Sequence, residues 1–162
     1  MSKKVVLAFS GGLDTSFCVP YLKEQGYEVH TVMVNTGGFS AEEEKAIEER
    51  AMKLGAASHK NVNAVNTYYE KGIRYLIYGN ILKNATYPLS VSSERVFQAL
   101  EVLKQVKAIG ADAVAHGSTG AGNDQVRFDI VFEILAPSVE IIAPVREHGF
   151  TRQYEIDFLQ QH

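Results

Sequence analysis

The sequence predicts an α/β fold in which helices cover both faces of a parallel β-sheet. Short continuous apolar runs, such as VVLAFS at 5–10, alternate along the chain with longer amphipathic segments. Continuous apolar runs are typical of strands buried on both faces, and the alternation is typical of strand–helix–strand units. Glycine-rich segments follow two of these runs, after Ser10 and after His116. Because ligands of such sheets bind beyond the carboxyl ends of the strands, we expect both segments to lie at one edge.

In the first half of the chain, strands are predicted at 5–10, 28–36 and 57–65, and helices at 14–25 and 40–54. The first strand is a continuous apolar run, and the helix that follows it ends at Gly26. In the second helix, Ser40 is the predicted N-cap and Glu43, three residues later, completes a capping box. Polar residues interrupt the third strand, ASHKNVNAV, so its pattern is the least regular of the three.

In the second half, helices are predicted at 67–78, 92–109, 125–135 and 151–162, and strands at 111–118 and 139–145. The turn-rich segment GNILKNATYPLS separates the first two of these helices. Thr151 is the predicted N-cap of the last helix, which carries apolar Tyr154 and Phe158. This helix runs to His162 without a glycine, proline or turn signal; a natural terminus can end in this way, but the pattern favours a chain cut at a domain boundary.

Length and composition favour one globular domain, since the chain has 162 residues of which 46% are apolar. The formal net charge of −3 argues against nucleic acid as the main partner. The single cysteine, Cys18, excludes an internal disulfide, which fits a reducing, cytoplasmic environment. No secretory signal pattern or membrane-spanning segment is present, so no membrane partner is expected. The histidines lack metal-ligand spacing, and we expect no protein-bound transition metal.

The segment SGGLDTS at 10–16 is unusually rich in groups that hold an anion. Its two glycines let backbone amides approach a ligand, and the following helix offers unpaired N–H groups with a partial positive charge. Three hydroxyl groups add to this, so the loop is suited to a phosphate or pyrophosphate. It lacks the Lys-Ser or Lys-Thr pair of a Walker A motif and the glycine spacing of the dinucleotide fingerprint. The alternative is a tight strand–helix turn with Asp14 as an ordinary cap.

Three motifs carry a resemblance to a known family. AFSGGLDTS at 8–16 resembles the pyrophosphate-binding (PP) loop of the N-type ATP pyrophosphatases. Together with YPLSVSSER at 87–95 and AHGSTGAGNDQVRFD at 115–129, it resembles the argininosuccinate synthase family, and the resemblance runs from Lys4 to about Phe158. The resemblance implies a Rossmann-like, HUP-type fold of the adenine nucleotide α-hydrolase kind. It also implies that residues 1–162 are the ATP-binding domain of a longer ligase, a homotetramer, whose C-terminal synthetase and oligomerisation region is absent from this chain.

The implied reaction joins citrulline and aspartate into argininosuccinate, with carbon–nitrogen bond formation and release of AMP and pyrophosphate, in arginine biosynthesis. The implied cofactors are ATP and Mg²⁺, with no protein metal ligand. The resemblance assigns ATP to Ala8, Phe9, Ser10, Gly11, Gly12, Leu13, Asp14, Thr15, Ser16, Val34 and Gly117. It assigns citrulline to Tyr87, Ser92, Asn123 and Arg127, and aspartate to Thr119, Asn123 and Asp124. Catalytic roles are implied for Asp14, Ser16, Asp124 and Arg127.

Some positions depart from the family pattern, and two other functions stay open. Ala121 stands where a lysine is common, Val91 where a threonine is usual and Val96 where a proline is usual. The loss of a lysine beside the phosphates would weaken nucleotide binding. One alternative is a tRNA-thiolating or amidating relative with the same loop, and another is an ATP-binding domain without catalysis. His116 is a candidate general base, with a structural role as the alternative.

Overall fold

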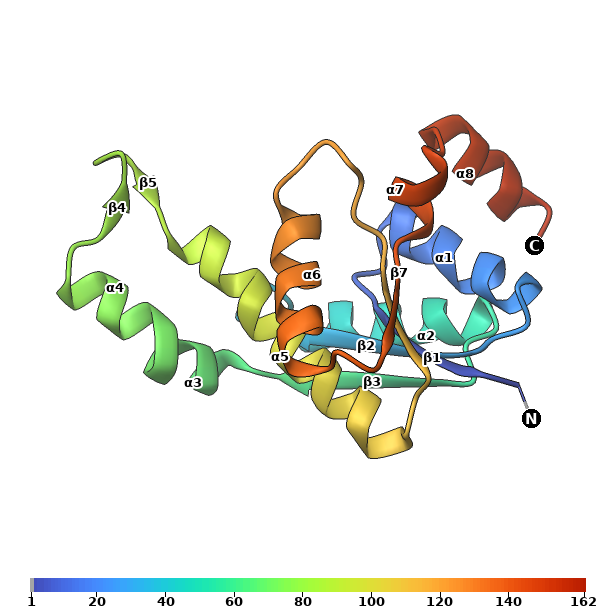
Figure 1. Cartoon of the computed structure of the whole chain (residues 1–162), viewed down its shortest axis with the longest axis horizontal. Helices are drawn as coiled ribbons and strands as arrows, with labels where there is room; N and C mark the ends of the chain where they lie inside the picture. The colour runs from blue at the N-terminus through green and yellow to red at the C-terminus, as the bar shows by residue number, and fades with distance from the viewer. Residues whose placement is uncertain (1) are drawn as a thin grey trace.

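The computed structural model describes residues 2–162, except for the side chain of Lys83. A five-stranded sheet, in which every pairing is parallel, forms the centre of the molecule, with strand order β3-β2-β1-β6-β7 (Figure 1). Its strands are β1 (Lys4–Ala8), β2 (Glu28–Asn35), β3 (Ser58–Asn63), β6 (Ala113–His116) and β7 (Glu140–Ile142). This topology confirms the predicted parallel α/β fold, and it places the carboxyl ends of β1 and β6 side by side.

The longer helices connect these strands. They are α1 (Leu13–Glu24), α2 (Ala41–Lys53), α5 (Ser90–Ile109), α6 (Asp124–Leu135) and α8 (Arg152–Gln160). The shorter elements are α3 (Val65–Tyr68), η1 (Tyr69–Ile73), α4 (Arg74–Tyr78), α7 (Pro144–His148) and the hairpin strands β4 (Leu82–Lys83) and β5 (Tyr87–Pro88). None of the helices within residues 2–162 combines the length and apolarity that crossing a membrane requires.

Apolar cores lie on both faces of the sheet because the side chains of the central strand alternate. Val5 and Leu7 point into one cluster, which also contains Phe17 of α1 and Ile47 of α2. Val6 points into the other cluster, with residues of α5 and α6. All three β1 side chains are fully buried, as the continuous apolar run predicts.

Helix α8 packs on helix α1 through aromatic side chains. The ring of Phe17 contacts the rings of Phe150 and Phe158 edge-on, with centroids 5.2 and 5.1 Å away, and Phe150 stacks on Tyr154. Aromatic pairs in this geometry stabilise packing beyond the area they bury. The last helix of the chain therefore lies beside the first (Figure 1).

Several local predictions are confirmed. The Ser40–Glu43 capping box is present, and Thr151 caps the last helix by accepting a hydrogen bond from the backbone N–H of Tyr154 at 3.2 Å. The polar strand β3 forms at the edge of the sheet, where none of its six residues is fully buried. The predicted strand at 139–145 is shorter than expected because Pro144 begins the short helix α7.

The segment between β3 and α5 differs most from the prediction. The predicted helix at 67–78 is three consecutive pieces, α3, η1 and α4, in which η1 is a π-helical turn. The turn-rich stretch after it folds into the β4–β5 hairpin, which we did not predict. These elements extend away from the sheet (Figure 1). They expose large apolar side chains, including those of Ile77 and Tyr78.

Candidate functional site

The loop between β1 and α1 presents an open helix N-terminus. Gly12 is the N-cap of α1, and no side chain caps this end. The first backbone N–H groups of a helix lack intrahelical partners, so here they are free to bind an anion. The alternative in which Asp14 is an ordinary cap is therefore contradicted. Gly11 has a φ of +75°, a conformation that favours glycine, and its carbonyl accepts a hydrogen bond from Arg50 of α2.

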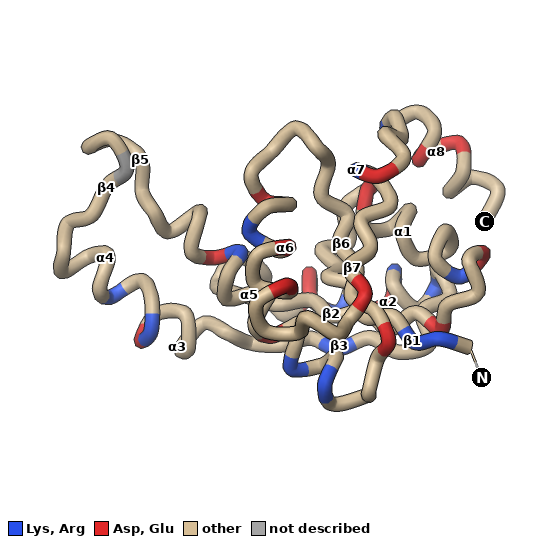
Figure 2. Tube along the Cα trace, in the orientation of Figure 1, with Lys and Arg blue, Asp and Glu red and all other residues tan. Residues whose placement is uncertain are grey.

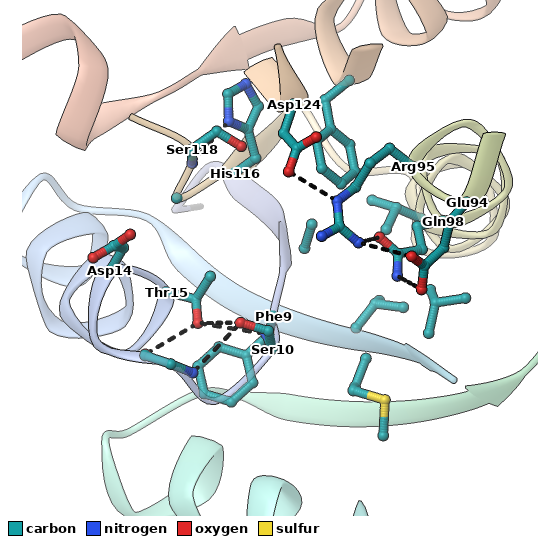
Figure 3. A pocket seen from close by; sticks show the side chains of 18 of the residues that line it. Phe9, Ser10, Asp14, Thr15, Glu94, Arg95, Gln98, His116, Ser118 and Asp124 are labelled. Atoms are coloured by element: carbon teal, nitrogen blue, oxygen red, sulfur yellow. Dashed lines mark hydrogen bonds and ion pairs between the residues drawn. The ribbon is translucent and has the colours of Figure 1, made fainter. Parts of the chain in front are cut away.

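Two of the three predicted hydroxyl groups line this loop. The hydroxyl oxygens of Ser10 and Thr15 lie 3.3 Å apart, and the backbone N–H of Gly12 donates to the hydroxyl of Ser10 at 3.4 Å (Figure 3). These long contacts leave both hydroxyl groups able to turn toward a ligand. Ser16 differs, because it is buried and does not line the cleft. Its hydroxyl has no hydrogen-bond partner among the described residues.

The second glycine-rich loop leaves β6 and contacts the first loop directly. Gly117 lies so close to α1 that a Cβ atom there would stand 3.0 Å from Cγ2 of Thr15 and 3.1 Å from the Thr15 nitrogen. The preceding residue, His116, is buried with both ring nitrogens engaged. The backbone N–H of Ser118 donates to Nδ1 at 3.2 Å, and Nε2 lies 2.9 Å from the Asp129 carboxylate.

These contacts favour a structural role for His116. Burial lowers the pKa of its imidazole, and the Asp129 carboxylate opposes this effect without reversing it. A neutral ring whose Nδ1 accepts a hydrogen bond donates from Nε2 to Asp129. The general-base interpretation is not supported by this geometry, because both ring nitrogens are already engaged by protein groups.

Both loops border one cleft of about 590 Å³ at the carboxyl edge of the sheet. Among the predicted ATP residues, the cleft is lined by Ala8, Phe9, Ser10, Gly12, Leu13, Asp14, Thr15, Val34 and Gly117. Among the predicted substrate residues, Thr119 and Asp124 also line it. The expectation that two segments remote in sequence share one site is met by this geometry.

Helix α5 supplies the opposite wall of the cleft. Arg95 is the one basic side chain among the described residues that line it. Its Nε donates to the Asp124 carboxylate at 3.1 Å, and its guanidinium also binds Gln98 at 2.9 Å (Figure 3). Glu94 accepts a hydrogen bond from the Thr36 hydroxyl at the end of β2 at 2.5 Å. The wall thus joins α5 to β2 and to the second loop.

Asp124 is held ionised in this wall. Partial burial disfavours its charge, but Arg95 and Arg127 outweigh this effect and lower the pKa of the carboxyl below its ordinary value. Arg127 donates from Nη1 to Asp124 at 2.6 Å and from Nη2 to the Ser92 hydroxyl at 3.0 Å. Ser92 and Arg127, which we predicted to share a ligand, are therefore direct neighbours.

The remaining predicted residues are less closely grouped. Asn123 is an exposed residue directly before α6, and its carbonyl accepts a hydrogen bond from the Arg127 amide at 3.2 Å. Tyr87 lies on the β4–β5 hairpin, is 45% exposed and does not line the cleft. The structure therefore brings Ser92 and Arg127 into contact, with Asn123 at the start of the helix that carries Arg127, and it places Tyr87 on the β4–β5 hairpin.

Sequence reasoning gave no role to several residues of the cleft. Glu94 and Arg95 end the YPLSVSSER motif and Gln98 lies three residues after it, yet we assigned no function to them. Gly38 and Phe39, which follow β2, also line the cleft. For Gly38 and Phe39, the position just after a strand could have indicated the site, since residues there lie at the ligand-binding edge of the sheet.

In the view of Figure 2, Lys and Arg positions and Asp and Glu positions both occur in most parts of the trace. Arg95, which lines the cleft, and Arg127 are both paired with the carboxylate of Asp124.

Comparison with known proteins identifies relatives along nearly the whole chain. The family described as "Arginosuccinate synthase N-terminal HUP domain" matches residues 4–162. An argininosuccinate synthase of Xanthomonas campestris is 47% identical over 164 aligned residues, which cover 99% of this chain and 41% of that protein. Another, of Pyrobaculum aerophilum, is 44% identical and covers 99% of this chain and 40% of the relative. The chain thus spans about two fifths of the length of these relatives.

Solved structures share the fold at low sequence identity. A 4-thiouridine synthetase in complex with RNA and bound ATP superimposes with a TM-score of 0.72 and 18% identity, covering 98% of this chain and 40% of that one. A predicted tRNA methyltransferase subunit from Methanocaldococcus jannaschii gives a TM-score of 0.62 and 22% identity, covering 98% and 74%. At these identities the likeness concerns the fold alone.

Proposed function

The chain belongs to the argininosuccinate synthase family, as its N-terminal HUP domain, and from this premise we propose that residues 1–162 bind ATP for the ligation of citrulline to aspartate. The observation that carries the proposal is the uncapped N-terminus of α1, which opens into the same cleft as the loop after β6. An anion-binding helix end beside a polar loop is suited to a nucleotide whose phosphates face a second substrate.

In the proposed reaction, the ureido oxygen of citrulline attacks the α-phosphorus of ATP. A bond forms between these atoms, the bond to the β-phosphate oxygen breaks, and pyrophosphate leaves. The amine of aspartate then attacks the ureido carbon of the citrullyl-adenylate, AMP leaves and the amine loses a proton. This sequence forms one carbon–nitrogen bond and gives argininosuccinate.

The phosphates are the part of ATP for which this cleft is best suited. The N–H groups in the first turn of α1 and the hydroxyls of Ser10 and Thr15 would receive the leaving pyrophosphate. Gly117 would border the nucleotide from the other loop, and Val34 would lie beside the adenine. Mg²⁺ would enter with the nucleotide and neutralise charge on the phosphates. We assign no protein ligand to it.

The amino-acid substrates would be held on the side of α6. Arg127 carries two parallel donors suited to a carboxylate, and Ser92 and Asn123 lie beside it. Thr119 and the ionised Asp124 would bind aspartate, the latter through its α-ammonium group. Tyr87 would have to approach from the hairpin, because it is exposed and outside the cleft lining.

A chimaera provides the direct test. Residues 1–162 would replace the corresponding part of the Xanthomonas campestris relative, and exchange of labelled pyrophosphate into ATP would be measured. We expect exchange that depends on citrulline, followed by argininosuccinate formation when aspartate is added. Exchange without citrulline, or supported by another acceptor, would contradict the assigned substrate.

The 162-residue chain by itself is proposed to bind ATP without efficient turnover, because the region that it lacks relative to the family would complete the amino-acid site and the tetramer. The main competing function is nucleotide binding without catalysis, and the separate position of Tyr87 favours it. Calorimetry separates the two, since a binding domain would take up ATP while the chimaera showed no citrulline-dependent turnover. A cytoplasmic location is part of the proposal, and the single buried cysteine, Cys18, which can form no disulfide within residues 1–162, fits a reducing compartment.

A further inference from the structure

A buried carboxyl group lies beneath the first turn of α1. Glu155 of α8 is 1% exposed, although it is a residue type that is rarely buried without a partner. No N–H or O–H donor among the described residues forms a hydrogen bond to its Oε2 atom. Burying an ionised carboxylate in this way is strongly unfavourable. The side chain therefore requires a proton or a cation.

The group that faces Glu155 is another carboxyl. The side chain of Asp14, in the first turn of α1, is within hydrogen-bond reach of it. Two carboxyl groups in hydrogen-bond contact form a stable pair when one proton is shared between them. In Figure 3, Asp14 points away from Ser10 and Thr15.

The surroundings of the pair offer little to balance two negative charges. The titratable groups near Glu155 are Asp14 and Cys18 on α1 and Arg152 on its own helix. Arg152 is exposed, and it favours the ionised form of Glu155 only weakly against burial. Cys18 lies one turn after Asp14 and is fully buried. Burial raises the pKa of its thiol, and Glu155 and Asp14 raise it further.

We propose that Glu155 is a positioning residue for the 10–16 loop: its buried carboxyl keeps a proton and donates it to Asp14, which ties helix α8 to the first turn of α1. The pair then carries one negative charge instead of two beside the phosphate site. Loss of the proton adds a charge there, which repels Asp14 and weakens anion binding. The part of this inference that concerns phosphates rests on the proposed function.

The position of the proton is consistent with the acid–base properties of the site. Burial, followed by the hydrogen bond and the charge of Asp14, raises the pKa of Glu155 to about 7. Glu155 therefore loses its proton within the physiological range, which adds one negative charge beside Asp14.

The first experiment needs no ligand. Carboxyl ¹³C signals of Glu and Asp, and amide signals of residues 12–16, would be followed by NMR from pH 5 to 8.5 in the 162-residue chain. We expect Glu155 and the loop amides to share a midpoint near 7. In Glu155→Gln, whose amide still donates to Asp14, the loop amides should keep their low-pH positions throughout. Asp157→Asn removes an exposed carboxylate from the same helix and serves as the matched control.

The proposal is overturned if Glu155 titrates in the ordinary range of glutamate, or if the loop amides do not follow its titration. Asp14→Asn provides a second route should Glu155→Gln fail to fold, because it must lower the Glu155 midpoint if the two groups share a proton. An unchanged midpoint in that variant contradicts the pairing.

The second experiment uses inorganic pyrophosphate as the probe, with affinities measured by calorimetry at pH 6 and pH 8. Comparison with Glu155→Gln at each pH removes the titration of pyrophosphate itself. We expect equal affinities at pH 6 and about fivefold tighter binding by the variant at pH 8, the effect of one nearby charge. If the ratio of the two pyrophosphate affinities is the same at pH 6 and pH 8, the proposed effect of Glu155 on anion binding by the loop is contradicted. Absence of pyrophosphate binding at either pH contradicts the proposed function, while the NMR titration still decides the pairing.

Discussion

Thr15 and Gly117 lie in van der Waals contact across the two loops, so closely that a methyl group on Gly117 would reach 3.0 Å from Cγ2 of Thr15. Such a contact is tighter than side-chain Cβ atoms ordinarily make, and backbone atoms of Asp14 and Thr15 lie at 3.1 Å on the same side. The second loop is therefore positioned against the first turn of α1 by the absence of a side chain.

Gly117→Ala should separate the two loops. Because the nearest atoms include backbone, they cannot rotate away, and the overpacking should lower the free energy of unfolding by about 1–3 kcal/mol. ATP affinity should fall about tenfold as the cleft widens. Urea unfolding and calorimetry measure the two effects. Gly120→Ala is the matched control, since its Cβ would meet no atom nearer than 3.9 Å and should change neither quantity.

Thr15→Val tests the hydroxyl groups of the first loop. Valine keeps the shape of threonine and removes the oxygen that lies 3.3 Å from the Ser10 hydroxyl. If this oxygen binds a phosphate, ATP affinity should fall about tenfold, the worth of one hydrogen bond, with little change in the melting temperature. Thr86→Val, on the exposed hairpin, is the control. An unchanged affinity in Thr15→Val would place the phosphates elsewhere.

Arg127→Gln tests the proposed amino-acid site beside the cleft in the chimaera. Removing a charged donor should raise the KM for citrulline about 10- to 100-fold, the range expected for a charge-assisted hydrogen bond. ATP affinity should stay within about twofold, because Arg127 does not line the nucleotide cleft. Arg74→Gln removes an arginine that pairs with Glu70 on η1, and should leave both quantities unchanged. Equal loss of ATP and citrulline binding in Arg127→Gln would contradict a separate substrate site.

Stability should depend on pH through Glu155. Its pKa is raised in the folded chain, from 4.5 to about 7, so the folded state binds the additional proton between these values. Stability from this group is present below pH 4.5 and is lost as the pH rises through 7. The loss should be on the order of 1–2 kcal/mol after allowance for screening by solvent. Urea unfolding of the unmodified chain and of Glu155→Gln between pH 5 and 8 gives the difference.

The comparison with Glu155→Gln also removes the contribution of His116 to the pH dependence of stability, which is opposite in sign to that of Glu155. Its pKa is lowered by burial, so the unfolded chain binds more protons and stability falls as the pH drops below 6.5. Both variants contain His116, and its contribution cancels in the difference. A difference that does not change with pH would contradict the raised pKa of Glu155.

The sequence predicted the features that depend on short-range patterns. The strand at 5–10, the capping box at Ser40 and the N-cap at Thr151 each follow from neighbouring residues, and each is present in the structure. The two glycine-rich loops meet as expected because parallel strands place their carboxyl ends at one edge. Glycines and hydroxyl groups after a strand were sufficient to locate the candidate site.

Contacts between segments that are far apart in the sequence could not be predicted from short-range patterns. Nothing near Arg95 in the sequence indicates that it would bind Asp124 across the cleft, and nothing near Glu155 indicates Asp14. These pairs depend on how α5 and α8 pack on the rest of the molecule. The hairpin at 82–88 was missed for a different reason. Each of its strands has only two residues, which is too short to show an alternating pattern.

The aromatic packing of α8 on α1 also has a consequence for biosynthesis. During translation α1 emerges early, and the apolar surface of Phe17 stays uncovered until Phe150 and Phe158 have been made. A nascent chain in this interval presents that surface to chaperones and to other unfinished chains. Release of the polypeptide before residue 150 would leave it uncovered permanently, so shortened products should aggregate or be degraded while the completed chain persists.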